Sequence, residues 1–350
     1  MIVIQGLILL AIAVVGGYAL HKALHRAFRA PRLGAGTDPG DLLVNGQGVR
    51  LPTAKGKSLF GWYAPPPAAP DRPSAPALVA IHGWGASADG LLPLAGVLQA
   101  AGYGVLLLDA RCHGRSDDDS FASLPRFAED LSAGLAWLRA RPEIDPARLG
   151  VMGHSVGAGA ALLTGSRHPD LAAVVSLAAF AHPEEVMRRT LEGWHVPYRP
   201  IGWVINRYVE RIIGHRFADI APVTTVARQQ APVLLLHGTA DTVVPIAEMM
   251  RLRDAARAAG CVVTAEPLPG VTHEGLDTET GESRLDLAAG TILAFLERHV
   301  PVADLERAQA DGWQGEELSD PSPERWTPPT SALGSGDVDD DDQDPTVLHG

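Results

Sequence analysis

The sequence predicts an α/β fold in which a mostly parallel central sheet is covered by helices on both faces. Short, continuous apolar runs alternate with longer amphipathic stretches, and such runs are typical of strands that are buried on both faces. Helical stretches such as 126–141 and 247–260 lie between most of the runs, which favours a doubly wound arrangement. The predicted strands are 77–82, 104–109, 149–153, 173–178, 232–237 and 262–266.

Composition limits the classes of protein to which the chain can belong. The 350 residues are 46% hydrophobic and 20% charged, so the chain can bury a sizeable core. The net charge is -12, much of it near the C-terminus, and no basic stripe with interleaved aromatic residues suggests nucleic-acid binding. The two cysteines, Cys112 and Cys261, form neither a disulfide framework nor a zinc-binding spacing, and we expect free thiols.

The N-terminus carries a long apolar stretch. Residues 2–20 are apolar except for Gln5 and would span about 28 Å as a helix, close to the hydrocarbon thickness of a bilayer. We predict a transmembrane anchor over 1–21 rather than a cleaved signal peptide or a buried helix, because no basic residue precedes the stretch. Four basic residues follow it, in a predicted basic juxtamembrane segment and linker over 22–41: Lys22, Arg26, Arg29 and Arg32. By the positive-inside rule, these residues predict a single-pass protein with its main domain in the cytoplasm.

The main domain is predicted to span 42–300. Two runs near its start, 42–53 and 58–65, indicate strands at an antiparallel edge of the sheet, and a proline-rich surface loop follows at 65–76. More than fifty residues separate the strands predicted at 173–178 and 232–237, too many for a simple crossover. We predict a helical cap insertion at about 182–222, with an ordinary helix pair packed on the core as the alternative.

The C-terminal segment, 301–350, is rich in Asp, Pro, Gly and Ser and is predicted to be an acidic disordered tail. It lacks the closing Glu of a calcium-binding loop.

A serine lies between two glycines where a predicted strand meets a predicted helix. The pattern Gly153-His154-Ser155-Val156-Gly157 is the Gly-x-Ser-x-Gly of a nucleophile elbow, in which small neighbours leave room for a strained serine. The helix N-terminus behind the serine favours developing negative charge. The glycine spacing fits a dinucleotide-binding loop poorly, and a helix-capping serine is the other alternative.

Two later residues can activate this serine. A serine nucleophile needs a histidine to take its proton and an acid to orient that histidine, and after an elbow they follow in the order acid, histidine. Asp241 follows the strand predicted at 232–237, and His273 follows the one at 262–266. We therefore predict Ser155, Asp241 and His273 as a catalytic triad. The other candidates fit less well by position: His154, His182, His195, His237, Glu248, Asp254, Glu274 and Asp277.

A hydrolase of this kind must also stabilise an oxyanion. The turn after the strand predicted at 77–82 reads His82-Gly83-Trp84, and it would lie beside the nucleophile. We expect the backbone N–H groups of Trp84 and Val156 to form the oxyanion hole. No metal ion or organic cofactor is expected.

These motifs, taken in order, resemble the α/β-hydrolase superfamily, in the serine-hydrolase branch that includes esterases, lipase-like enzymes and serine aminopeptidase-like members. The resemblance runs from about residue 42 to residue 300 and rests on "HGWG", "DARCHGRS", "GHSVG", "GTAD" and "VTHEG". It implies a complete triad, and a structural role for four residues of the second motif: Asp109, Arg111, His113 and Ser116. Cys112 departs from the family pattern, where a smaller or amide residue is common.

The predicted activity is hydrolysis of an ester through an acyl-enzyme, on a small-molecule or lipid-like substrate with an apolar acyl group. A peptidase that anchors a peptide terminus through Glu184, Glu185 or Glu192 is the alternative, as is a thioesterase or acyltransferase. The alternative of another class is a non-catalytic, membrane-anchored scaffold, although a scaffold would have no need of an elbow, an acid and a base together. Protein partners are not predicted.

Overall fold

The computed structural model describes residues 2–27, 29–32, 39–40, 42–69, 74–276, 278, 280 and 285–302. Most of the predicted tail, part of the predicted linker and Asp277 lie outside these residues.

An eight-stranded sheet forms the centre of the fold, in the order β1-β2-β4-β3-β5-β6-β7-β8. The two strands predicted at an antiparallel edge pair with each other, β2 continues antiparallel to β4, and the remaining pairs are parallel. The predicted mostly parallel sheet is therefore confirmed. The strands are β1 (Gln47–Thr53), β2 (Lys57–Ala64), β3 (Ala75–Ile81), β4 (Gly104–Leu108), β5 (Ile144–His154), β6 (Ala173–Leu177), β7 (Val233–Gly238) and β8 (Val263–Leu268).

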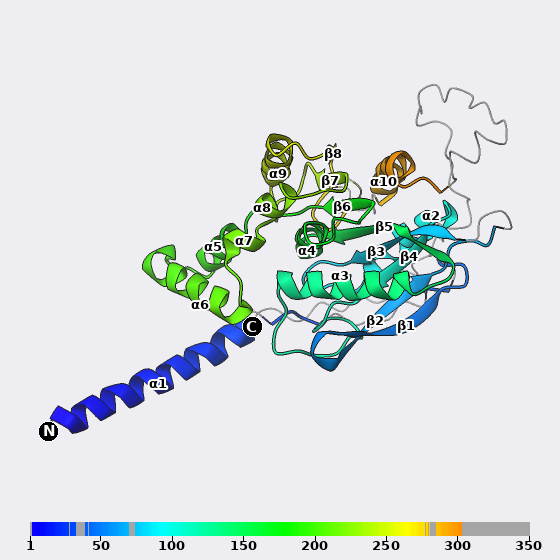
Figure 1. The fold of residues 1–350 in the computed structure, drawn as a ribbon. Helices are drawn as coiled ribbons and strands as arrows, with labels where there is room; N and C mark the ends of the chain where they lie inside the picture. The colour runs from blue at the N-terminus through cyan, green and yellow to red at the C-terminus, as the bar shows by residue number, and fades with distance from the viewer. Residues whose placement is uncertain are drawn as a thin grey trace, which may run out of the picture. The chain divides into compact units, whose positions relative to one another are not determined.

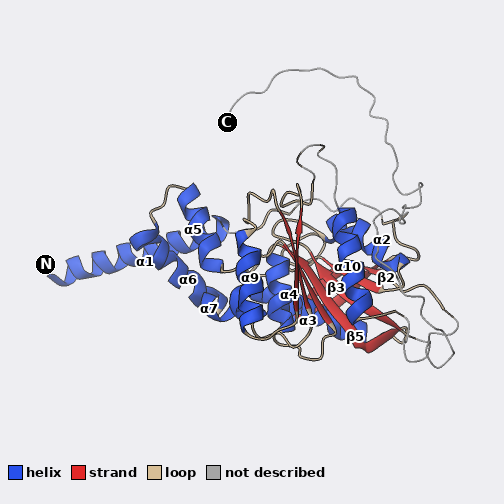
Figure 2. Ribbon diagram, turned by 90° about the horizontal axis from the view of Figure 1, so that it is seen from above, coloured by secondary structure: helices blue, strands red, loops and turns tan. Residues whose placement is uncertain are grey.

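Helices cover both faces of the sheet, as Figure 2 shows. One face packs against α3 (Leu124–Arg139), α4 (Val156–Gly165) and α9 (Ala247–Ala258), and the other against α2 (Leu92–Ala100) and α10 (Leu285–His299). Neighbouring strand residues alternate between the two cores: Val79 and Ile81 face the first, and Leu78 and Ala80 the second. The continuous apolar runs are explained by this two-sided burial.

Four α-helices and a short π-helical turn at Tyr198–Gly202 fill the long interval between β6 and β7. The α-helices are α5 (Pro183–Gly193), α6 (Trp203–Ile213), α7 (Phe217–Ile220) and α8 (Pro222–Val226). In Figure 1, α5 and α6 (green) stand apart from the strands. The separate hydrophobic cluster that these two helices form has only two buried members, Leu191 and Ile205. We call α5, α6 and the residues between them the cap.

The predicted membrane anchor is not supported. Its residues do form one continuous helix, α1 (Ile2–Ala27). However, no helix within the described part of the chain is long and apolar enough to cross a membrane.

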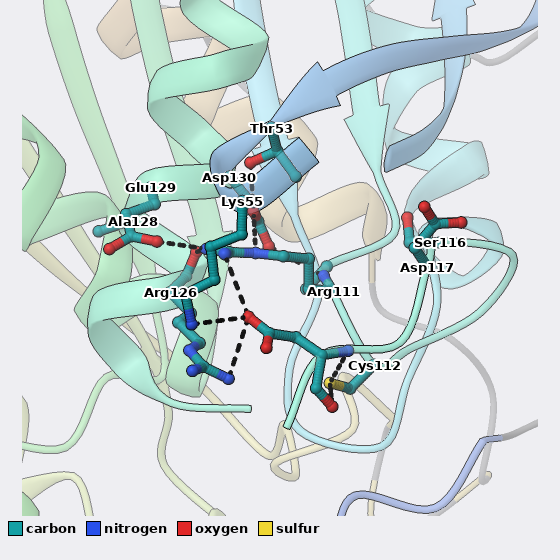
Figure 3. Close-up of polar contacts among 12 residues, drawn as sticks. Thr53, Lys55, Arg111, Cys112, Ser116, Asp117, Arg126, Ala128, Glu129 and Asp130 are labelled. Carbon is teal, nitrogen blue, oxygen red and sulfur yellow. Dashed lines mark hydrogen bonds and ion pairs between the residues drawn. The ribbon is translucent and has the colours of Figure 1, made fainter. Parts of the chain in front are cut away.

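A buried arginine fixes the loop after β4, as Figure 3 shows. Arg111 Nε lies 2.7 Å from Asp130 Oδ1, and its Nη2 lies 2.5 Å from Glu129 Oε2, both on α3. Asp119 lies 3.5 Å from Arg111 Nη1 and also pairs with Arg126 at 3.2 Å. The structural role implied for this motif agrees with these contacts. The loop in turn supports the turn at residues 82–84, because the ring centroid of His113 lies 5.0 Å from that of His82 and 5.7 Å from that of Trp84.

Candidate active site

The backbone at Ser155 is the strained turn that the glycine pattern predicts. Ser155 connects β5 to α4 with φ +54° and ψ −116°, in a region that side chains rarely adopt. A Cβ atom at position 153 would lie 2.0 Å from the carbonyl oxygen of Gly157, and one at position 157 would lie 2.4 Å from that of His82. Both glycines are therefore required by close backbone contacts rather than by flexibility alone.

The structure brings the three predicted triad residues together. Ser155 Oγ lies 3.0 Å from His273 Nε2, and His273 Nδ1 lies 2.7 Å from Asp241 Oδ2. The three residues come from the ends of β5, β7 and β8, which are parallel and so meet at the same edge of the sheet. This arrangement allows proton transfer from the serine hydroxyl to the histidine.

The surroundings of Asp241 keep it ionised. Its Oδ1 accepts hydrogen bonds from the N–H groups of Val243 and Val244, at 2.9 and 2.7 Å. Burial raises the pKa of the carboxyl group, but the hydrogen bonds that it accepts, from His237, His273 and the Val244 N–H among others, outweigh burial and hold that pKa below its ordinary value. A buried anion in contact with His273 Nδ1 stabilises the imidazolium that forms when His273 takes a proton.

The contact between His237 and Asp241 was not predicted from the sequence. His237 Nε2 lies 3.2 Å from Asp241 Oδ2 and 2.7 Å from the carbonyl oxygen of Val244, so this histidine braces both the acid and its loop. The available sequence signal was the four-residue spacing between His237, at the end of a strand, and Asp241. This spacing brings the two side chains together only when the loop between them turns back.

His154 supports the other side of the histidine loop. Its Nε2 lies 2.8 Å from the carbonyl oxygen of His273, so this nitrogen carries the proton and donates it to the carbonyl. Burial, with a smaller contribution from His273, lowers the pKa of His154 to about 4, so the ring is neutral at pH 7. A histidine set aside in the sequence analysis therefore holds the backbone of the predicted general base.

A cavity of about 660 Å³ lies over Ser155 and beneath the cap. Trp84 and Val156, the predicted oxyanion-hole residues, both line it beside Ser155. Its walls are largely apolar, and they include Phe121, Leu124, Phe180, Val186, Met187, Trp194, Val209, Ile212, Ile213, Phe217 and Ile220. Within the described residues, no acidic side chain lines this cavity, and Arg189 and His25 are the basic ones.

The three predicted peptide anchors lie elsewhere. Glu184 accepts a hydrogen bond from Tyr198, Glu185 pairs with Arg251 at 2.6 Å, and Glu192 is exposed at the end of α5. Glu248, a rejected candidate acid, instead joins the cap to the main domain: it pairs with Arg189 at 2.6 Å and accepts the Ala181 N–H at 2.8 Å.

The remaining candidates have other places. His182 caps the start of α5 and His195 is exposed in the cap. Asp254 pairs with Arg253 on the surface, and Glu274 lines a separate cavity of about 260 Å³. Among the described residues, no group of three or more His, Cys, Asp or Glu side chains is placed to hold a metal ion.

Comparison with known proteins agrees with this geometry. The sequence pattern of the prolyl oligopeptidase family, Peptidase_S9, matches residues 126–302, just over half of the chain. An uncharacterized protein of Mycobacterium tuberculosis is 29% identical over 261 residues, which are 73% of this chain and 82% of that protein.

Solved structures share the fold. The chain is similar to the Pyrococcus furiosus esterase Pf2001, with a TM-score of 0.60, 22% identity, and coverage of 78% of this chain and 97% of that one. It is also similar to a puromycin-hydrolyzing peptidase of Mycobacterium tuberculosis, with a TM-score of 0.59, 20% identity, and coverage of 75% and 40%.

Proposed function

This chain belongs to the prolyl oligopeptidase family of serine hydrolases, and we propose that it hydrolyses carboxylic esters of apolar acyl groups. The observation that carries the proposal is the cavity of about 660 Å³ over Ser155, which has apolar walls and, in the described part of the chain, no acidic side chain. Its volume lies within the range of sites that enclose small organic ligands.

In the proposed mechanism, Ser155 Oγ attacks the ester carbonyl while His273 Nε2 takes its proton. The N–H groups of Trp84 and Val156 stabilise the oxyanion, and Asp241 stabilises the imidazolium. Collapse of the tetrahedral intermediate breaks the bond to the alcohol, which receives the proton from His273. Water then attacks the acyl-enzyme with His273 as base, and release of the acid restores Ser155.

The described residues that line the cavity include no acidic anchor, which argues against a peptidase that binds a free amino terminus. Such a substrate would bring an ammonium group into an apolar cavity, and burying a charge without a partner costs several kcal/mol. Glu184, Glu185 and Glu192 do not line the cavity and cannot supply that partner there.

An acyl-capped peptide is the second candidate. The chain also resembles a Pyrococcus horikoshii acylaminoacyl peptidase, with a TM-score of 0.58 and 17% identity. A blocked amino terminus carries no charge, so the same apolar cavity could hold it without an acidic anchor. A thioester would use the same triad.

The first experiment is labelling with a fluorophosphonate, which reacts with activated serines. We expect wild type to label and Ser155→Ala not to. Ser132→Ala is a matched control, because Ser132 also contacts a histidine, with its Oγ 2.9 Å from His168 Nε2, but lies outside the cavity. Labelling that survives in Ser155→Ala contradicts the proposed nucleophile.

A substrate series then separates the candidates. We expect p-nitrophenyl esters from butyrate to decanoate to be hydrolysed, with kcat falling at least about 10⁴-fold in Ser155→Ala. Faster turnover of N-acetylated aminoacyl p-nitroanilides than of every ester would favour the acyl-peptide alternative. Turnover of the free-amine p-nitroanilides alone would contradict the argument from the missing anchor.

A further inference from the structure

Three apolar side chains that line the cavity over Ser155 are also exposed, and so lie at its mouth. Trp84, Trp194 and Val243 all line the cavity, yet they are between 40% and 55% exposed. Large apolar side chains at the rim of a cavity mark a surface that meets another apolar surface. These side chains therefore form an apolar surface at the mouth of the cavity, where a binding partner would contact the protein.

The cap carries further exposed apolar side chains and adds positive charge. We define the cap apex as residues 194–211, which share Trp194 with the mouth of the cavity and also include exposed Ile201, Trp203 and Val204. Its basic residues are Arg199, Arg207 and Arg211, all exposed. The apex carries one carboxylate, Glu210, which is buried, pairs with Arg207 at 3.0 Å and accepts the Phe217 N–H at 2.8 Å.

The charge of the apex is opposite to that of the whole protein. Arg199 and Arg211 leave the apex net positive, whereas the chain carries a net charge of -12. Tryptophan and arginine together suit the boundary between an apolar phase and anionic headgroups, because the ring is buried at the boundary while the guanidinium stays with the headgroups.

We propose that the cap apex docks on the surface of an anionic lipid layer, so that the cavity mouth faces the lipid and receives its acyl substrate from it. This deepens the proposed function by naming the source of the substrate. Docking itself does not depend on catalysis and can be measured separately.

The test measures binding of the full chain to vesicles of pure phosphatidylcholine and of phosphatidylcholine with phosphatidylglycerol. Arg199→Gln/Arg211→Gln should bind the anionic vesicles about 30-fold more weakly than wild type, from the attraction expected of two arginines at such a surface. Arg199→Lys/Arg211→Lys should restore binding, and Trp203→Ser should weaken it on both vesicle types.

Val262→Ser is the matched control, because Val262 is 57% exposed but lies directly before β8, outside the cap. All variants keep α1, so any binding through that helix is common to them. None of the substituted residues lines the cavity, so hydrolysis of soluble p-nitrophenyl butyrate should not change. Hydrolysis of a long-chain ester dispersed in the anionic vesicles should fall in parallel with binding.

Equal binding of the wild type, the arginine variant and Trp203→Ser would overturn the proposal. Equal binding of the wild type to both vesicle types would also overturn it. An acidic protein partner would be indicated instead if soluble polyglutamate displaced the wild type from vesicles and bound Trp203→Ser as tightly as it binds the wild type. Vesicle binding without hydrolysis of any ester would refute the proposed function and leave docking in place.

Discussion

Replacing His154 by glutamine should make the protein more tolerant of acid. The pKa of His154 in the folded protein is about 4, against about 6.5 in an unfolded chain. Because the folded state binds the proton less tightly, the stability that neutral His154 contributes is complete above pH 6.5 and is lost as the pH falls toward 4. Linkage then gives a loss of about 2 kcal/mol between pH 8 and pH 5. This is an upper figure, because His154 also lines the 260 Å³ cavity.

The substitution by glutamine separates the effect of protonating His154 from the effect of its hydrogen bond to His273. Its amide N–H can still donate to the carbonyl oxygen of His273, so the unfolding free energy of His154→Gln at pH 8 should lie within about 1 kcal/mol of wild type. His154→Leu removes the donor and should cost about 1–3 kcal/mol relative to wild type at pH 8. It should also lower kcat, because the His273 loop loses its support.

The assay is urea unfolding of the wild type and of His154→Gln at pH 8 and pH 5. His82, whose pKa burial lowers to about 3, is present in both, so its contribution cancels in the comparison. The loss of stability between the two pH values should be smaller in His154→Gln by up to about 2 kcal/mol. An equal loss in both proteins would refute the assignment of a half-buried, neutral His154.

Asp241→Asn should lower kcat on p-nitrophenyl butyrate by about 10⁴-fold without loss of fold, and activity above a tenth of wild type would contradict its role. Gly157→Ala should destabilise the protein by about 3 kcal/mol or more, since its Cβ would meet a carbonyl oxygen at 2.4 Å; an unchanged Tm would count against this. Arg111→Met should cost about 3–5 kcal/mol in chemical unfolding by leaving Asp130 buried and unpaired, and a second change, Asp130→Asn, should recover part of it. Met187→Trp should lower kcat/KM for decanoate about tenfold relative to butyrate, and an unchanged ratio would place the acyl chain elsewhere.

Local chemistry explains why much of the fold and the site could be predicted. Strands buried on both faces must be apolar at every position, so their runs stand out in the sequence without any knowledge of their partners. The elbow is equally local, because Gly153 and Gly157 are required by backbone contacts within a few residues or with the adjacent strand end. Asp241 and His273 could be identified because each follows such a run, and parallel strands bring their ends to one edge.

The N-terminal prediction shows the limit of apolar content as a signal. The stretch over 1–21 was long and apolar enough to suggest an anchor, yet the structure supports only a helix there. A run of apolar residues reports that a segment avoids water, not what it is packed against.

What the sequence determined by itself was therefore the sheet, the elbow and the identity of the three residues that now lie within hydrogen-bond reach. Only the tertiary structure decided how those residues are supported and what they face. His154 and His237 hold the loops of His273 and Asp241 through contacts that depend on how separate strand ends meet. The apolar cavity, in which no described residue is an acidic anchor, depends on how the cap lies over Ser155. Such properties arise from side chains distant in sequence, and no local pattern encodes their distances.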